Sequence, residues 1–141
     1  MINANIKINT KKTIKDAMIK IDKNAMGIVF VVNSDDKLLG VLTDGDIRRA
    51  ILKGANIFSS CEALMKKNFI KMREDEPKTK ILKLLQKYKN SVKVIPIINK
   101  KGELVDYATS DRLNFIPIYY PRLKGNELKY LSKCITDNWI S

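Results

Sequence analysis

The chain has 141 residues, of which 45% are hydrophobic and 30% are charged, a composition typical of soluble globular proteins. This length suffices for one compact domain or two very small ones. There is no apolar run near the roughly 20 residues that span a bilayer and no signal-peptide pattern at the first residues, so we expect a cytoplasmic protein without membrane partners. The two cysteines are far apart and no histidine accompanies them, which argues against a metal site and for a reducing compartment.

The positive charge is unevenly distributed. Of the net charge of +12, residues 62–101 carry +8, because they hold twelve Lys/Arg and four Asp/Glu. A basic surface attracts the phosphates of nucleotides or of nucleic acid. The lysines alternate with apolar residues at helical spacing, however, as on the solvated face of a helix, and no series of aromatic residues is interleaved to stack bases. The pattern therefore argues against nucleic-acid binding.

An internal repeat is the strongest feature of the sequence. The pattern of residues 31–43 recurs at 97–109, an offset of 66. Each copy predicts a β-hairpin, with the polar turns Asp35-Asp36 and Lys101-Gly102 between apolar strands.

A helical pattern precedes each hairpin. Apolar residues fall at i, i+3, i+4 and i+7 from Ile14 in the first copy and from Ile81 in the second, an offset of 67. A further helix is expected over 46–53, with Gly54 well placed to end it. Short extended stretches precede the two units: 6–8 and 69–72.

The unit is therefore β-α-β-β-α. Alone it would bury too little apolar surface to be stable. We expect an α/β (α+β) fold in which two such units, 1–58 and 59–115, pack sheet against sheet with pseudo-twofold symmetry.

The repeat together with Gly-Val-Leu-Thr-Asp-Gly-Asp at 40–46 resembles the cystathionine-β-synthase-type (CBS) domain, in two copies over about residues 5–115. The run from Thr43 to Arg49 is similar to CBS pairs attached to sugar-phosphate isomerases and sugar nucleotidyltransferases of surface-polysaccharide synthesis. The resemblance implies a regulatory module that binds an adenine nucleotide or a nucleotide sugar in the cleft between the repeats. It also implies a homodimer formed through the CBS helices.

The resemblance implies that Asp46 bonds the ribose hydroxyls and that the Thr43 hydroxyl lies near ribose or phosphate. A helix starting near Asp44 would offer free N–H groups and its positive end to a phosphate. Gly45 would allow close approach of a ligand, and two arginines would add charge-assisted bonds. The candidate nucleotide-binding residues are Val41, Thr43, Asp44, Gly45, Asp46, Arg48 and Arg49 in the first copy and Thr109, Asp111 and Arg112 in the second.

Two alternatives remain open for these residues. Thr43 and Asp46 have the spacing of a helix capping box, and capping by itself would explain both, although the two roles can coexist. In the second copy Thr109 corresponds to Thr43, but Arg112 replaces Asp46 and Asp111 lies one position early. The second site is therefore expected either to be empty or to be directed toward an anionic ligand by Arg112.

Residues 116–141 do not continue the repeat. The opening Pro-x-Leu-x-Gly-Asn-Glu at 121–127 and the ending Trp-Ile-Ser at 139–141 resemble the start of pyridoxal-phosphate-dependent sugar aminotransferases that act on nucleotide-linked keto-sugars. This resemblance implies a linker and the truncated start of such an enzyme, whose pyridoxal phosphate would belong to a domain outside this chain. The alternative is a C-terminal helix that packs on the CBS pair, because Leu128, Leu131 and Ile135 have helical spacing.

Three classes of function compete. The chain would sense a nucleotide and adjust an attached aminotransferase, or it would be a structural dimerisation scaffold without ligand. Catalysis by these residues is disfavoured, since no histidine and no nucleophile with a base is present, and no cofactor is expected in this chain. A wide polar opening beside Thr43 and Asp46 would favour sensing, and side chains filling it would favour the scaffold.

Overall fold

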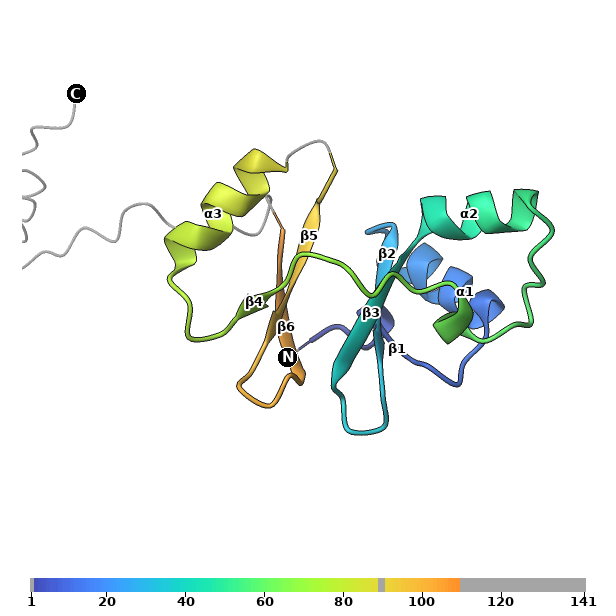
Figure 1. Ribbon diagram of the computed structural model, residues 1–141, viewed down its shortest axis with the longest axis horizontal. Coiled ribbons are helices and arrows are strands. Elements are labelled where there is room, and N and C mark those ends of the chain that lie inside the picture. Colours follow the sequence, from blue (N-terminus) through green and yellow to red (C-terminus); the bar gives the residue numbers. More distant parts are fainter. Residues whose placement is uncertain (1, 89–90, 110–141) are drawn as a thin grey trace, which may run out of the picture.

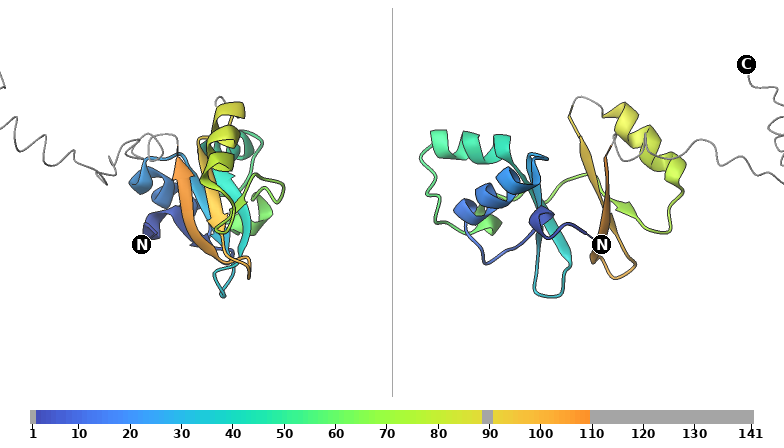
Figure 2. Two further views of the ribbon diagram at one scale, coloured as in Figure 1. Left: turned by 90° about the vertical axis from the view of Figure 1, so that its left-hand side faces the viewer. Right: turned by 180° about the vertical axis from the view of Figure 1, so that it is seen from behind.

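The computed structural model describes residues 2–88 and 91–109. Two three-stranded sheets occupy the middle of the molecule, and the helices lie on their outer sides (Figure 1). The view from behind shows the same order of layers, with one sheet facing the other (Figure 2, right). Within the described ranges, no helix has the length and apolar character needed to cross a membrane.

The first repeat contains one sheet and two helices. Strand β1 pairs in parallel with β2, and β2 pairs antiparallel with β3. The elements are the short 3-10 helix η1 (Ala4–Ile6), β1 (Lys7–Asn9), α1 (Ile14–Asn24), β2 (Ile28–Val32), β3 (Leu38–Thr43) and α2 (Asp44–Leu52).

The second repeat has the same sheet, with β4 parallel to β5 and β5 antiparallel to β6. Its elements are η2 (Cys61–Ala63), β4 (Met72–Arg73), α3 (Lys78–Lys87), β5 (Val94–Ile98) and β6 (Leu104–Thr109). Both hairpins recur 66 residues apart, as predicted. The helix that would correspond to α2 falls outside the described residues.

The predicted offset between the helices is wrong by about one helical turn. Ile8 pairs with Val31 and Met72 pairs with Ile97, so the first strands are related by 64 residues, and the helices start at 14 and 78, also 64 apart. An amphipathic pattern looks similar after a shift of one turn, and the sequence pattern therefore could not fix this offset. The two additional residues of the second repeat lie between α3 and β5.

A core shared by both repeats lies between the two sheets. It contains buried side chains from both repeats, among them Phe30, Val41, Leu104 and Tyr107, and the residues of the N-terminal segment pack against it. At the tips of the hairpins the Leu38 N–H donates to the Gly102 carbonyl at 3.0 Å. Packing of sheet against sheet is thus confirmed. It removes from water the apolar faces that neither unit could cover alone.

The segment after α2 packs on the first repeat before the chain crosses to the second. Cys61 is fully buried in the core of the first repeat, and burial raises the pKa of its thiol to about 11. Lys66 and Val41 exchange two main-chain hydrogen bonds, of 2.8 and 3.0 Å. Gly40 permits this close approach, because a Cβ there would lie 2.9 Å from the Met65 side chain. The linker is thereby held against β3.

Candidate functional site

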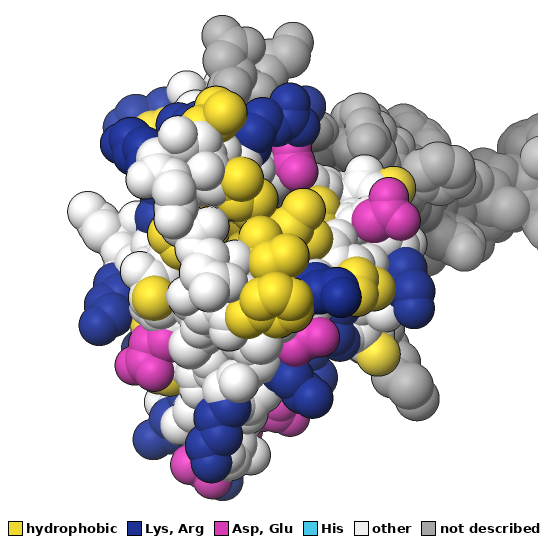
Figure 3. Space-filling model, turned by 90° about the vertical axis from the view of Figure 1, so that its right-hand side faces the viewer, with side chains coloured by type: hydrophobic (Ala, Val, Ile, Leu, Met, Phe, Trp, Pro, Cys, Tyr) yellow, Lys and Arg dark blue, Asp and Glu magenta, His cyan; other side chains and the backbone are white. Residues whose placement is uncertain are grey.

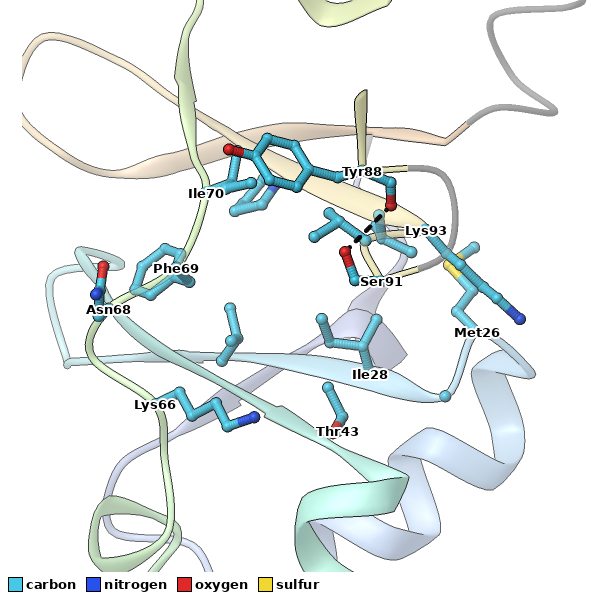
Figure 4. A pocket seen from close by; sticks show the side chains of 15 residues that line it. Met26, Ile28, Thr43, Lys66, Asn68, Phe69, Ile70, Tyr88, Ser91 and Lys93 are labelled. Carbon is cyan, nitrogen blue, oxygen red and sulfur yellow. Dashed lines mark hydrogen bonds between the residues drawn. The ribbon is translucent and has the colours of Figure 1, made fainter. Parts of the chain in front are cut away.

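A cavity of about 450 Å³ lies between the repeats. The start of β2 and the end of β3 form one side, the linker crosses a second side, and the turn from α3 into β5 forms the third (Figure 4). The lining residues are Met26, Gly27, Ile28, Val41, Thr43, Lys66, Asn68, Phe69, Ile70, Tyr88, Ser91, Val92, Lys93, Val94 and Pro96.

The cavity combines apolar walls with a few polar groups. Its charged lining residues are Lys66 and Lys93, and no carboxylate is among the described lining residues. Two aromatic side chains, Phe69 and Tyr88, lie on one side of the cavity, across from Thr43 (Figure 4). This combination suits a ligand with an aromatic ring and an anionic group. The described residues include no cluster of histidine, cysteine or acidic side chains that could hold a metal ion.

Thr43 is both the last residue of β3 and the N-cap of α2. Its hydroxyl accepts a hydrogen bond from the Asp46 N–H at 3.2 Å and donates to Asp46 Oδ2 at 2.6 Å. The Asp46 carboxylate thus bonds the hydroxyl, in place of the Thr43 main-chain N–H of a full capping box. The predicted cap is present, and it holds the Thr43 side chain at the edge of the cavity.

The Asp46 carboxylate also holds two cations. Its Oδ1 accepts from Arg49 Nη2 at 2.6 Å and from Lys66 Nζ at 2.8 Å, and only 9% of the side chain is exposed. Burial by itself raises the pKa of Asp46, but hydrogen bonds from Lys66, Thr43 and Arg49 outweigh that effect and lower the pKa to about 2. Asp46 is therefore a permanent anion beside the cavity at neutral pH.

The structure separates the predicted first-copy residues into two groups. Val41 and Thr43 line the cavity, and Asp46 is one contact away from it through Lys66. The remaining four are not among the lining residues, and the two arginines are paired within α2, Arg48 with Asp44 at 2.7 Å and Arg49 with Asp46. The residues outside the lining are Asp44, Gly45, Arg48 and Arg49.

Comparison with known families agrees with this geometry. The sequence model described as "CBS domain" matches residues 1–53 and again residues 61–113. The chain belongs to the CBS domain family.

Two curated proteins are similar in sequence to this chain. The chain is 30% identical over 109 residues to the L-aspartate semialdehyde sulfurtransferase of Methanosarcina acetivorans, covering 77% of this chain and 21% of that protein. It is 27% identical over 92 residues to the arabinose 5-phosphate isomerase GutQ of Salmonella typhi, covering 65% of this chain and 28% of that protein. The chain thus spans less than a third of either relative.

Solved CBS pairs share the fold. A CBS domain protein from Pyrobaculum aerophilum complexed with AMP matches with a TM-score of 0.65 at 19% identity, over 78% of this chain and 83% of that one. The CBS pair of protein MJ0100, in complex with 5′-methylthioadenosine and S-adenosyl-L-methionine, matches with a TM-score of 0.63 at 24% identity, over 77% and 84%. These likenesses confirm the architecture of tandem CBS repeats.

Sequence reasoning missed most of the cavity of the CBS pair. Lys66 and Phe69 lie on the linker, and Tyr88, Ser91 and Lys93 lie between α3 and β5. None belongs to the motif that carried the family resemblance. The repeat itself was a signal that could have found part of the second side of the cavity. A cleft between two repeats is lined by both of them, and under the offset of 66 Val94 is the equivalent of Ile28.

The pseudo-twofold symmetry of the repeats implies a second cleft, equivalent to the cavity described above. The side chains at the equivalent positions differ. Under the offset of 66, Tyr107 takes the place of Val41, and Phe30 takes the place of Pro96. Both aromatic side chains are buried, and their ring centroids are 6.4 Å apart. Larger rings thus stand where the first cleft has a valine and a proline. Thr109 ends β6 as Thr43 ends β3, whereas Asp111 and Arg112 lie outside the described residues.

Proposed function

We propose that this CBS pair is a regulatory module that binds one nucleotide, an adenine nucleotide or a nucleotide sugar, in the cavity between its repeats. The carrying observation is the cavity itself, at about 450 Å³, because pockets for small molecules measure roughly 300–1,000 Å³. A scaffold without ligand would have no need for an opening beside Thr43. The aromatic pair Phe30 and Tyr107 in the related cleft supports a single site in the first copy.

The ligands of related structures support the chemistry of this proposal. The solved neighbours named above hold AMP in one case and two adenosine derivatives in the other. In the present chain, Tyr88 or Phe69 would stack on the base, since aromatic rings stack on any of the bases without distinguishing between them. The apolar walls would exclude water, and the hydroxyl of Thr43 would bond ribose or phosphate.

Asp46 remains the proposed ribose ligand. A carboxylate has acceptor sites enough to bond further donors, and this carboxylate lies directly behind Thr43 at the edge of the cavity. To reach it, a ribose hydroxyl must approach the oxygen that holds Lys66 and Arg49. Binding would then include a rearrangement of these cations.

The regulated partner is proposed to be a sugar aminotransferase of nucleotide-sugar or polysaccharide synthesis. The support is the resemblance of residues 117–141 to the start of such enzymes and of the Thr-Asp-Gly-Asp motif to CBS pairs of sugar pathways. The tail, including the alternative of a packed C-terminal helix, lies outside the described residues. Expression of a longer chain with pyridoxal phosphate and an assay for amino transfer to keto-sugar nucleotides would test the assignment.

We further propose that the module forms a homodimer through its helices. The face formed by α1 and α2 shows a cluster of hydrophobic side chains (Figure 3). Its exposed apolar residues include Met18, Ile19, Ile51, Leu52 and Phe58, and Leu52 is 81% exposed. Such a patch is typical of an interaction surface. Dimerisation and sensing are compatible, because the cavity lies on the sheet side of the molecule, away from this face.

A thermal-shift screen tests the proposed function. The panel contains AMP, ADP, ATP, S-adenosyl-L-methionine, CMP and the CMP-, UDP- and GDP-sugars. A ligand at 100 times its dissociation constant stabilises the native state by about 2.7 kcal/mol. Thr43→Val should abolish most of the ligand-induced shift, whereas the equivalent change Thr109→Val should not. If no compound raises the melting temperature of the parent, the module is a scaffold.

A further inference from the structure

Lys66 has a main chain fixed by hydrogen bonds and a side chain that is largely exposed. Its N–H and carbonyl are bonded to Val41 at 2.8 and 3.0 Å, and the neighbouring Met65 side chain is packed against Gly40. Its side chain, in contrast, is 57% exposed, lines the cavity and extends toward Thr43 (Figure 4). The ammonium group can therefore change partners without disturbing the linker.

The Asp46 carboxylate, which is now paired with Lys66, has other hydrogen-bond donors as well. When the ammonium leaves Asp46 Oδ1, the Arg49 guanidinium still donates to that oxygen at 2.6 Å, and the Thr43 hydroxyl still donates to Oδ2 at 2.6 Å. The carboxylate, which is mostly buried, would not be left as an unpaired charge, the situation that is costly in proteins. Exchange of Lys66 from Asp46 to another anion therefore costs little.

The charge of the cavity indicates which anion that would be. Lys66 and Lys93 are its charged lining residues, and no described carboxylate lines it. The Asp46 carboxylate beside it keeps the Arg49 guanidinium as a counter-ion, at 2.6 Å. A phosphate accepts charge-assisted hydrogen bonds that are about twice as strong as neutral ones. The net charge of +12 favours the approach of any anion.

We propose that Lys66 is the phosphate-binding residue of the cavity and that it moves from Asp46 to the phosphate when a ligand enters. This inference rests on the proposed function and narrows its ligand class to nucleotides that carry a phosphate. Neutral nucleosides and cationic adenosine derivatives are excluded as preferred ligands. The exchange also opens one side of Asp46 Oδ1, which is where a ribose hydroxyl would bond.

Titration calorimetry on the full chain tests the proposal with four pairs of probes: AMP, CMP, GMP and UMP, each with its nucleoside. In the parent protein the binding monophosphate should exceed its nucleoside in affinity by about tenfold or more. Lys66→Met should lower the affinity for the monophosphate by about tenfold to a hundredfold and leave the affinity for the nucleoside unchanged. Lys66→Arg should retain most of the affinity. Lys67→Met is the matched control, because Lys67 is the adjacent exposed lysine and does not line the cavity.

A second measurement follows Asp46 directly. In a carboxyl-carbon NMR titration, the pKa of Asp46 should rise from about 2 both in Lys66→Met and when the monophosphate binds the parent. A merely structural lysine would not produce the second effect.

The outcomes separate the proposal from the function on which it rests. Equal affinity for nucleoside and monophosphate, or equal losses in the Lys66 and Lys67 variants, would overturn the role of Lys66 and leave a nucleoside-binding module. An Asp46 pKa that does not change on binding would overturn the exchange. If none of the eight probes binds the folded parent, the phosphate-binding role of Lys66 is wrong, and the thermal-shift screen decides separately whether the module senses any nucleotide.

Discussion

Replacement of Asp46 by asparagine removes the negative charge on which three donors converge while keeping the size of the side chain. In the native protein the pKa of this carboxyl is lowered from 3.8 to about 2. A difference of nearly two pKa units, at about 1.4 kcal/mol each, corresponds to about 2 kcal/mol of stabilisation by the ionised form. The Asp46 side chain is only 9% exposed, but those of Lys66 and Arg49 are 57% and 65% exposed, so solvent screening keeps this contribution at or below about 2 kcal/mol.

The sign of the pH dependence follows from the lowered pKa. A group whose pKa is lower in the native than in the unfolded state stabilises the protein above its unfolded pKa. The contribution of Asp46 is therefore complete above about pH 4 and is lost as the pH falls toward 2. Asp46→Asn should cost about 2 kcal/mol at pH 7, and the difference between parent and variant should shrink steadily below pH 4.

Urea unfolding followed by circular dichroism at pH 7, 5, 4 and 3 measures this effect. With a slope of about 2 kcal/mol per molar urea, the midpoint should fall by about 1 M at pH 7. Asp44→Asn is the matched control in the same first turn of α2, so that the helix dipole acts on both. Asp44 is 51% exposed and, among the described residues, its ion pair is with Arg48, so its loss should cost less than about 0.5 kcal/mol. Equal losses in the two variants would refute the reasoning, as would a cost at Asp46 that is the same at pH 7 and pH 3.

Three further predictions concern packing and exposure. Gly40→Ala places a Cβ 2.9 Å from Met65 and should lower the free energy of unfolding by about 1–3 kcal/mol. Gly45→Ala meets only the flexible end of an arginine side chain and should be neutral or stabilising by up to about 1 kcal/mol. Urea unfolding compares the two variants, and similar effects would contradict the close packing of the linker against Gly40. Cys61, with a buried thiol whose pKa is about 11, should resist iodoacetamide at pH 8 until urea is added; rapid alkylation of the native peptide, seen by mass spectrometry, would show that the site opens. Leu52→Glu should convert a dimer to a folded monomer by light scattering, because Leu52 is 81% exposed and its change removes apolar contact area only in the dimer; a parent that is monomeric at micromolar concentration would disprove the dimer.

The sequence by itself determined the features that depend on neighbouring residues. The hairpins at 31–43 and 97–109 could be predicted because strand alternation and turn residues are local properties. The same holds for the N-cap at Thr43 and for the end of α2 near Gly54, where φ is +90°. The need for two units to share a core followed from the small size of each.

Only the tertiary structure decided how distant residues meet. The offset of the helices depended on strand pairing, since amphipathic periodicity repeats after each turn. The contact of Lys66 with Asp46 joins the linker to α2, and no spacing in the chain predicts it. The lining of each cleft depends on the side chains that two facing sheets bring together, Val41 and Pro96 in one cleft and Tyr107 and Phe30 in the other. Packing decides such questions because the size and charge of a cavity depend on distances in space, which a one-dimensional pattern does not contain.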